Sequence, residues 1–173
     1  MTQGIQHVYF FGDGVHHDLS NPNDVLGCKG ANLAEMTRLG LPVPPGFTVS
    51  TVACRNYYEE NETLSPGLVE EATRCLERLE RITDRALGDP DRPLLVSVRS
   101  GASVSMPGMM DTILNLGLND DVVAGIAARP GMARFAYDAY RRFLEMYSEV
   151  VLGMKAGKSV SYTHLTLPTK PFV

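Results

Sequence analysis

The chain has 173 residues, of which 44% are hydrophobic and 21% are charged, as is typical of globular rather than disordered proteins. This length allows one domain with a hydrophobic core or two small lobes. The formal net charge of −4 argues against general electrostatic binding to nucleic acid or to an anionic membrane, so any anion site must be local.

Compartment is predicted from what the sequence lacks. No apolar run approaches the roughly 20 residues that span a bilayer, and residues 1–10 do not have the pattern of a secretory signal. Cys28, Cys54 and Cys75 are widely spaced and odd in number, which favours reduced thiols over disulfides or zinc binding. We therefore expect a cytoplasmic protein.

The first predicted element is a strand over Val8–Phe11, and Gly12–Gly14 after it predicts a turn that could fold the chain into a hairpin. His16 and His17 follow. Neighbouring side chains on an extended segment point to opposite faces, so we expect a solvated hairpin rather than a metal pair.

A compact helix is expected at about Ala31–Leu39, where Gly40 can cap its end. Lys29 then lies at or just before the helix N-terminus, where backbone N–H groups favour an anion. This arrangement suits a phosphate held by the lysine and the free N–H groups. The alternative is an exposed lysine on a loop.

The three prolines in Pro42–Gly46 exclude a helix, and a strand is expected over Phe47–Ser50. Ser50 or Thr51 can cap a helix that runs to about Glu60. Residues 66–87 form an amphipathic pattern whose charged side is a solvated helix face.

A short buried strand is predicted over Leu94–Val98, and it is followed by Arg99 and by the small residues Ser100, Gly101 and Ala102. Small residues let backbone N–H groups approach an anion beside a guanidinium. The alternative is that Arg99 forms an ordinary salt bridge and that the glycines mark turns.

Beyond Leu118 the pattern is helical, with helices near Asp120–Ala128 and Gly131–Leu152. The apolar stripe predicted for the second helix consists of Phe135, Ala139, Phe143, Met146, Tyr147 and Val150. Gly153–Ser159 is close to a P-loop, but only three residues separate its glycines and no strand precedes it, so we reject that interpretation.

Two motifs resemble those of the pyruvate, phosphate dikinase family. The first is Gly27–Met36 followed by Leu41–Phe47, and the second is Ser97–Ala102 followed by Ser105–Leu118. The resemblance extends from Val8 to Gly153. One departure is Cys28, which stands where the family commonly has glycine, and a positive φ there would strain the cysteine.

The resemblance implies an α+β fold with a small mixed sheet, as the first lobe of an ATP-grasp-type nucleotide-binding domain over residues 1–118. The start of a helical subdomain is expected over 119–153, with its apolar stripe packed against helices that come later in the family. Residues 154–173 are expected to be a non-native or disordered tail, because Ser161–Thr169 looks like translated cloning or adaptor DNA.

The resemblance also implies the site. Lys29 and Arg99 would contact ATP phosphates, Ser100, Gly101 and Ala102 would line the loop, and Asp111 and Thr112 would lie close by. No catalytic residue and no metal ligand is expected in the chain, because the acidic Mg²⁺ ligands belong to the second lobe of the family's domain.

Complete enzymes of this family convert ATP, phosphate and pyruvate into AMP, pyrophosphate and phosphoenolpyruvate through a phosphohistidine on a separate domain. The implied partners are therefore ATP, phosphate and the remaining dikinase domains, in a homodimeric enzyme.

Two alternatives stay open. A phosphoenolpyruvate synthase-like domain shares the Lys and Arg positions, but it carries Ser-Ser-Ala where this chain has Ser100, Gly101 and Ala102. An inactive truncated fragment that acts at most as a binding module is the other. We expect the chain alone to turn over nothing and to bind ATP weakly.

Overall fold

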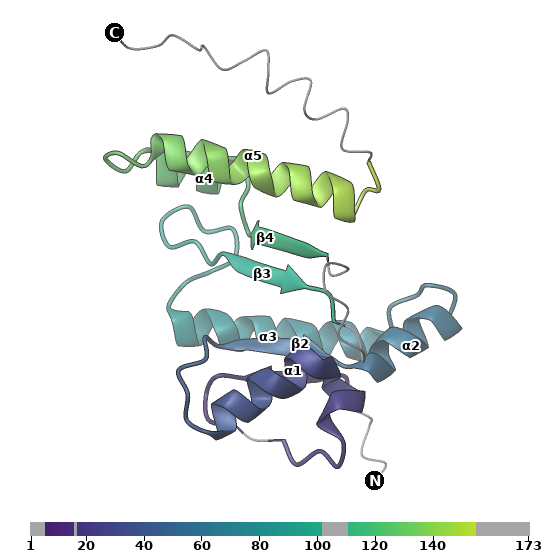
Figure 1. Ribbon diagram of the computed structural model, residues 1–173. Coiled ribbons are helices and arrows are strands. Elements are labelled where there is room, and N and C mark those ends of the chain that lie inside the picture. Colours follow the sequence, from purple (N-terminus) through teal and green to yellow (C-terminus); the bar gives the residue numbers. More distant parts are fainter. Residues whose placement is uncertain (1–5, 16, 102–110, 155–173) are drawn as a thin grey trace, which may run out of the picture. The chain divides into compact units, whose positions relative to one another are not determined.

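The computed structural model describes residues 6–15, 17–101 and 111–154 (Figure 1). These residues form two compact units, the first from residues 6–85 with 100 and 101, and the second from residues 86–99 with 111–154. Each unit combines helices with one two-stranded antiparallel sheet, which confirms the predicted mixture of helix and strand. The predicted small mixed sheet is wrong for the described residues, which form two separate antiparallel sheets. None of their helices is long and apolar enough to cross a membrane.

The first unit contains β1 (Val8–Phe11), α1 (Pro22–Arg38), β2 (Gly46–Val49), α2 (Thr51–Glu59) and α3 (Pro66–Thr83). The strand predicted at 8–11 is confirmed, but its partner is not the segment directly after the turn.

Strand β1 pairs with β2, and Val8 lies opposite Val49. The reason is visible at Gly12, which has φ +90° and lies so close to Pro45 that an added Cβ would be 2.6 Å from the proline Cα. The turn therefore packs against the segment that leads into β2. The expectation for His16 lies outside the described residues, and Nε2 of His17 is 3.0 Å from the Phe10 carbonyl oxygen.

Helices cover both faces of this sheet. Helix α3 packs on the face that carries Phe10, because the Arg78 guanidinium lies 4.5 Å from the centre of the phenyl ring. Helix α1 packs on the opposite face at Thr48, since successive side chains of a strand alternate between faces. The carboxylate of Glu71 on α3 also accepts hydrogen bonds of 2.8 Å from the backbone N–H groups of His7 and Val8.

Short-range chemistry sets the ends of these helices. Ser50 and Ser65 cap α2 and α3 by accepting hydrogen bonds from Ala53 N–H and Leu68 N–H, and the cap predicted at Ser50 is confirmed. Helix α1 ends in a Schellman motif, in which Gly40 N–H bonds the Thr37 carbonyl and Leu41 N–H bonds the Met36 carbonyl.

Helix α3 is shorter than predicted. It ends at Thr83 because Asp84 adopts the left-handed conformation with φ 51°. The chain beyond it does not continue the amphipathic helix, since Ala86 forms a bridge with Pro93.

The second unit contains β3 (Val96–Arg99), β4 (Thr112–Leu116), α4 (Asp120–Ala127) and α5 (Ala133–Val150). Strand β4 is absent from the sequence-based prediction, which treats residues 105–118 as a motif. Strand β3 starts later than expected and is less buried, because Val98 is 46% exposed. The core of this unit consists of Ile113, Leu118, Val122, Val123, Ile126, Ala136, Ala139 and Phe143.

The predicted stripe of α5 is partly wrong. Ala136, Ala139 and Phe143 are buried, whereas Phe135 is 57% exposed. The buried face therefore runs along positions 136, 139, 140, 143 and 147, and it packs against α4 and β4 within this chain. Other apolar side chains of α5, including Phe135, Tyr137 and Leu144, are exposed, so the packing of later helices of the family on α5 stays a prediction.

Candidate functional site

Helix α1 is interrupted immediately before Lys29. Gly27 has φ 68° and ψ 168°, so α1 consists of two helical pieces that meet at this residue. Lys29 is therefore in the first turn of the second piece, and it is half-buried. The first backbone N–H groups of a helical piece lack partners inside it, and the helix dipole places partial positive charge there. The start of the second helical piece of α1, at Lys29, therefore has the properties of an anion site.

The residue that carries the unusual backbone geometry is a glycine, not Cys28. Among the described residues the positive φ angles of non-glycine residues occur elsewhere, at Asn61, Glu62, Asp84 and Asn115. Cys28 therefore takes an ordinary backbone conformation. The strain considered for a cysteine at this position does not arise, because Gly27 makes the turn.

Gly30 brings α1 close to the sheet. A Cβ atom added to Gly30 would lie 2.9 Å from Leu26 Cβ and 2.9 Å from Thr48 Cγ2, which is closer than side chains pack. The two glycines that flank Cys28 and Lys29 thus have different tasks. Gly27 turns the backbone, and Gly30 lets the second helical piece lie directly on β2.

Lys29 also meets the second predicted motif. Its Nζ donates a hydrogen bond of 3.4 Å to the carbonyl oxygen of Ser100, and both residues lie in the first unit. Ser100 and Gly101 are exposed and follow β3 directly. The contact brings together two segments that are 71 residues apart in the chain.

Arg99, Asp111 and Thr112 lie at one end of the sheet of the second unit. Arg99 ends β3 and pairs with Thr112, the first residue of β4. Arg99 and Asp111 are exposed and Thr112 is half-buried. No ion pair joins Arg99 to another described residue, so the structure gives no support to the ordinary salt bridge considered for it.

The structure thus locates six of the seven predicted site residues, and Ala102 lies outside the described part. Gly27 and Thr48 are contributors that the sequence argument misses. Of these two residues, only Gly27 has a recognisable feature in the sequence, because a glycine just before a predicted helix can mark a break in the chain. Within the described ranges, no group of three or more His, Cys, Asp or Glu side chains could hold a metal ion.

Comparison with known proteins identifies the class of domain. Residues 23–85 match the family model described as "Pyruvate phosphate dikinase, AMP/ATP-binding domain". This range contains Gly27, Lys29 and Gly30 and extends to the end of α3. The matched segment is therefore part of an AMP/ATP-binding domain.

The relatives are similar over most of the chain. A chloroplastic pyruvate, phosphate dikinase of Mesembryanthemum crystallinum is 57% identical over 153 residues, which are 88% of this chain and 16% of the relative. Pyruvate, phosphate dikinase 2 of Zea mays is 59% identical over 147 residues, and the enzyme of Rhizobium meliloti is 55% identical over 147 residues, in each case 85% of this chain and 16% of the relative. The chain belongs to the pyruvate, phosphate dikinase family and spans about 16% of the length of these relatives.

Proposed function

We propose that this chain forms part of the ATP-binding domain of a pyruvate, phosphate dikinase, and that Lys29 and Arg99 contact the nucleotide phosphates. Ser100, Gly101 and Ala102 line the phosphate-binding loop in this proposal, and Asp111 and Thr112 lie beside it. The reaction of the complete enzyme is the conversion of ATP, phosphate and pyruvate into AMP, pyrophosphate and phosphoenolpyruvate. The polypeptide is an ATP-grasp-type first lobe over residues 1–118, followed by the start of a helical subdomain.

The observation that carries this proposal is the position of Lys29. Its ammonium group stands at the start of a helical piece and within 3.4 Å of the Ser100 carbonyl oxygen, so the two motifs that resemble the family meet at one cation. An ammonium group has three N–H donors. One can stay on the Ser100 carbonyl while the others bind phosphate oxygens, which would tie the loop to α1 when the anion is present.

The chemistry fits phosphate better than other ligands. Lys29 and the helix start supply a positive charge and backbone donors, and Arg99 supplies a planar fork that can bind two phosphate oxygens at once. Groups of this kind stabilise the charge on a phosphoryl group during transfer. The described residues of this chain supply binding and orientation, and the phosphohistidine is proposed to lie on another domain.

Mg²⁺ accompanies ATP in this proposal, but the described residues do not fit a metal centre because they contain no suitable cluster. We place the metal ligands in the second lobe of the domain. The further proposed partners are phosphate, the remaining dikinase domains and a second subunit, in the cytoplasm. A phosphoenolpyruvate synthase-like domain is less well supported, because the named relatives are pyruvate, phosphate dikinases.

The test is a titration of the full chain with ATP, in which binding is monitored by NMR. Two solvent-open cationic contacts are each worth about 1 kcal/mol, and immobilising the ligand costs several kcal/mol, so we expect a dissociation constant on the order of millimolar. Lys29→Ala should weaken binding by about fivefold or more. In a complete dikinase with these residues, Lys29→Ala or Arg99→Ala should slow phosphorylation of the histidine at least about tenfold, or ~1.4 kcal/mol.

Arg38→Ala is the matched control, because Arg38 is an exposed cation on the same helix that is paired with Glu35. It removes the same charge away from the proposed site. Equal weakening by Lys29→Ala and Arg38→Ala would contradict the assignment of Lys29. A dissociation constant of about 10 μM or tighter would show that the chain holds a complete site, contrary to the proposal.

A further inference from the structure

Strand β4 carries a bulge near its C-terminal end. Val96 of β3 lies opposite Leu116, but Val98 lies opposite Ile113. Two steps along β3 therefore correspond to three steps along β4, so β4 contains one extra residue between these pairs. Asn115 lies in this stretch and has φ 59°, and a residue in the left-handed conformation is a recognised cause of such a bulge.

The bulge cannot be removed by sliding β4 along β3, because the chain is fixed on both sides of it. Ile113 is 8% exposed and lies in the core of the second unit. After the bulge, the Leu118 N–H donates a hydrogen bond of 3.2 Å to the Asn115 carbonyl oxygen. Gly117 approaches Leu94 so closely that an added Cβ would lie 2.4 Å from the Leu94 carbonyl oxygen. Packing and hydrogen bonding therefore hold the register on each side of Asn115.

The extra residue decides which side chains share a face of the sheet. Ile113 and Leu116 both pack in the core of the second unit. Residues three positions apart in a regular strand point to opposite faces, so a regular β4 could direct only one of them to the core. The left-handed conformation of Asn115 thus allows both to face the core.

The same extra residue selects the cross-strand partner of Arg99. If the register at Leu116 continued without a bulge, Arg99 would lie opposite Ile113. With the bulge, Arg99 lies opposite Thr112, and both are on the sheet face away from Ile113 because side chains alternate along a strand. A threonine hydroxyl, which can donate to a phosphate oxygen, therefore occupies the position opposite Arg99 in place of an apolar side chain.

We propose that Asn115 is a positioning residue for the phosphate site, whose left-handed backbone conformation holds Thr112 opposite Arg99 so that the hydroxyl and the guanidinium bind one phosphate group. This inference rests on the proposed function, because it requires that Arg99 contacts the nucleotide phosphates. Asn115 acts through these two residues and does not itself contact the ligand. Asparagine takes the left-handed conformation more readily than most residues with a Cβ atom, and glycine takes it more readily still.

The experiment replaces Asn115 with valine, whose branched side chain disfavours the left-handed conformation, and with glycine, which accepts it. In the full chain, NMR cross-peaks between the backbone protons of residues 99 and 112 should be lost in Asn115→Val and kept in Asn115→Gly. In a complete dikinase with these residues, Asn115→Val should raise the KM for ATP about fivefold or more, as for the loss of one ionic contact. Asn115→Gly should stay within about twofold of the parent enzyme. A variant that only reduces the folded fraction would instead lower kcat and leave KM unchanged.

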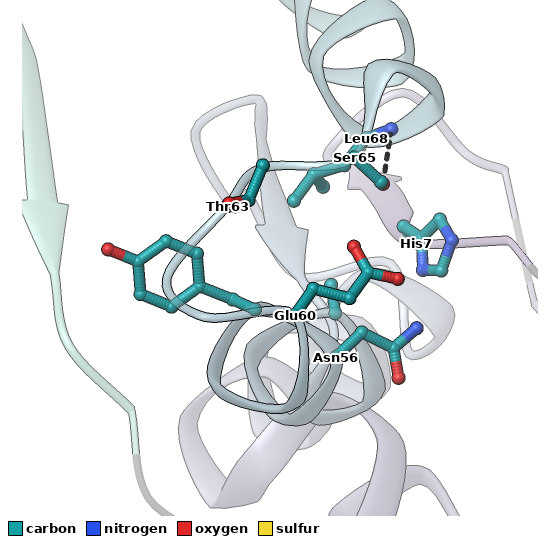
Figure 2. Close-up of a pocket in the computed structure, with 8 residues that line it drawn as sticks. His7, Asn56, Glu60, Thr63, Ser65 and Leu68 are labelled. Carbon is teal, nitrogen blue, oxygen red and sulfur yellow. Dashed lines mark hydrogen bonds between the residues drawn. The ribbon is translucent and has the colours of Figure 1, made fainter.

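Asn61→Val is the matched control. Asn61 has φ 52°, but it lies in the turn between Glu60 and Thr63, two residues that line a small pocket of the first unit (Figure 2). It takes no part in the pairing of β3 with β4. The control removes the same kind of left-handed asparagine, and it should leave the KM for ATP within about twofold of the parent.

Asn115→Ala, which disfavours the left-handed conformation less strongly than valine does, supplies a second test if Asn115→Val does not fold, and it should raise KM at least about twofold. An unchanged KM in the Asn115 variants, an equal rise in Asn61→Val, persistence of the cross-peaks between residues 99 and 112 in Asn115→Val, or no rescue by Asn115→Gly would overturn the proposal. Arg99→Ala is measured in the same assay. If Arg99→Ala raises KM and Asn115→Val does not, only this inference fails, whereas an unchanged KM in Arg99→Ala would contradict the proposed function as well.

Discussion

At the residue scale, the surroundings of Lys29 depend on side chains that are absent. Gly27 adopts φ 68°, a conformation that residues with a Cβ atom rarely take. Gly30 has no unusual φ, but its Cα faces Leu26 and Thr48 at close range. The lysine is therefore positioned by one glycine that permits a backbone turn and another that permits a close helix–strand contact.

The first prediction concerns Gly30→Ala. The new methyl group would lie 2.9 Å from Leu26 Cβ and from Thr48 Cγ2, so α1 must move away from β2. We expect a loss of about 1–3 kcal/mol in the free energy of unfolding, the usual cost of overpacking, measured by urea denaturation.

Gly67→Ala is the control for this substitution. Gly67 lies in the first turn of α3 with nothing within 4 Å of an added Cβ, and alanine is the better helix former. Its stability should be unchanged or slightly higher. Equal losses for Gly30→Ala and Gly67→Ala would show that the close contact with Thr48 has no energetic weight.

At the element scale, α3 holds the first strand in place through side chains spaced along its length. Glu71 accepts from the N–H groups at the start of β1. One to two turns later, Arg78 forms an ion pair with Asp13 and lies over the Phe10 ring. The charged side of α3 that the sequence predicts as a solvated face is therefore not wholly solvated, because Glu71 and Arg78 on that side contact β1.

We predict that Arg78→Ala destabilises the protein by about 1–2 kcal/mol, because it removes a cation–π contact and leaves Asp13 without its ion-pair partner. The Asp13 side chain is only 13% exposed, so water compensates it poorly. Arg81→Ala on the exposed side of the same helix should change stability by less than about 0.5 kcal/mol. Thermal unfolding of the two variants distinguishes a specific contact from a general effect of charge.

A second element-scale prediction concerns the orientation of α5. Phe143 is 8% exposed within the core and Phe135 is 57% exposed. Phe143→Ala should cost about 3–5 kcal/mol, whereas Phe135→Ala should cost less than about 1 kcal/mol. Similar losses of stability for the two variants in chemical denaturation would show that Phe135 is buried, as the apolar stripe predicted from the sequence requires.

At the scale of the whole molecule, the relatives align with 145 to 154 residues of the 173. The sequence predicts that the resemblance ends near Gly153, and the predicted tail over 154–173 lies outside the described residues except for Met154. We predict that deletion of Ser159–Val173 leaves the midpoint of thermal unfolding unchanged within error. A loss of several degrees would show that the tail packs against the core.

Elements with strong local signals could be predicted from the sequence. Ser50 is a helix cap in both the prediction and the structure, and the strand at 8–11 agrees in its bounds. The sequence places Lys29 at or just before a helix that starts at about Ala31, whereas α1 begins at Pro22 and Lys29 lies in the first turn after the break at Gly27. These features depend on residues that are close together in the chain.

Features that depend on distant contacts could not be predicted. The Gly12 turn looks like a hairpin turn, but the approach of Pro45 directs the chain elsewhere. The orientation of α5 is decided by α4 and β4, since both Phe135 and Phe143 fit an apolar stripe by spacing alone. The contact between Lys29 and Ser100 joins residues whose proximity no local pattern indicates.

The pairing of β1 with β2 has a consequence for how the chain folds during synthesis. Val8 cannot meet Val49 until the whole of α1 and the proline-rich segment have left the ribosome. Until then, the Val-Tyr-Phe-Phe sequence of β1 is an apolar strand with unpaired backbone groups, the kind of segment that associates with other chains. Helix α1 can form from local contacts in that interval, whereas the strand must wait for a distant partner. Strand β1 is thus made well before its partner, and this part of the nascent chain is most vulnerable to aggregation before residue 49 emerges.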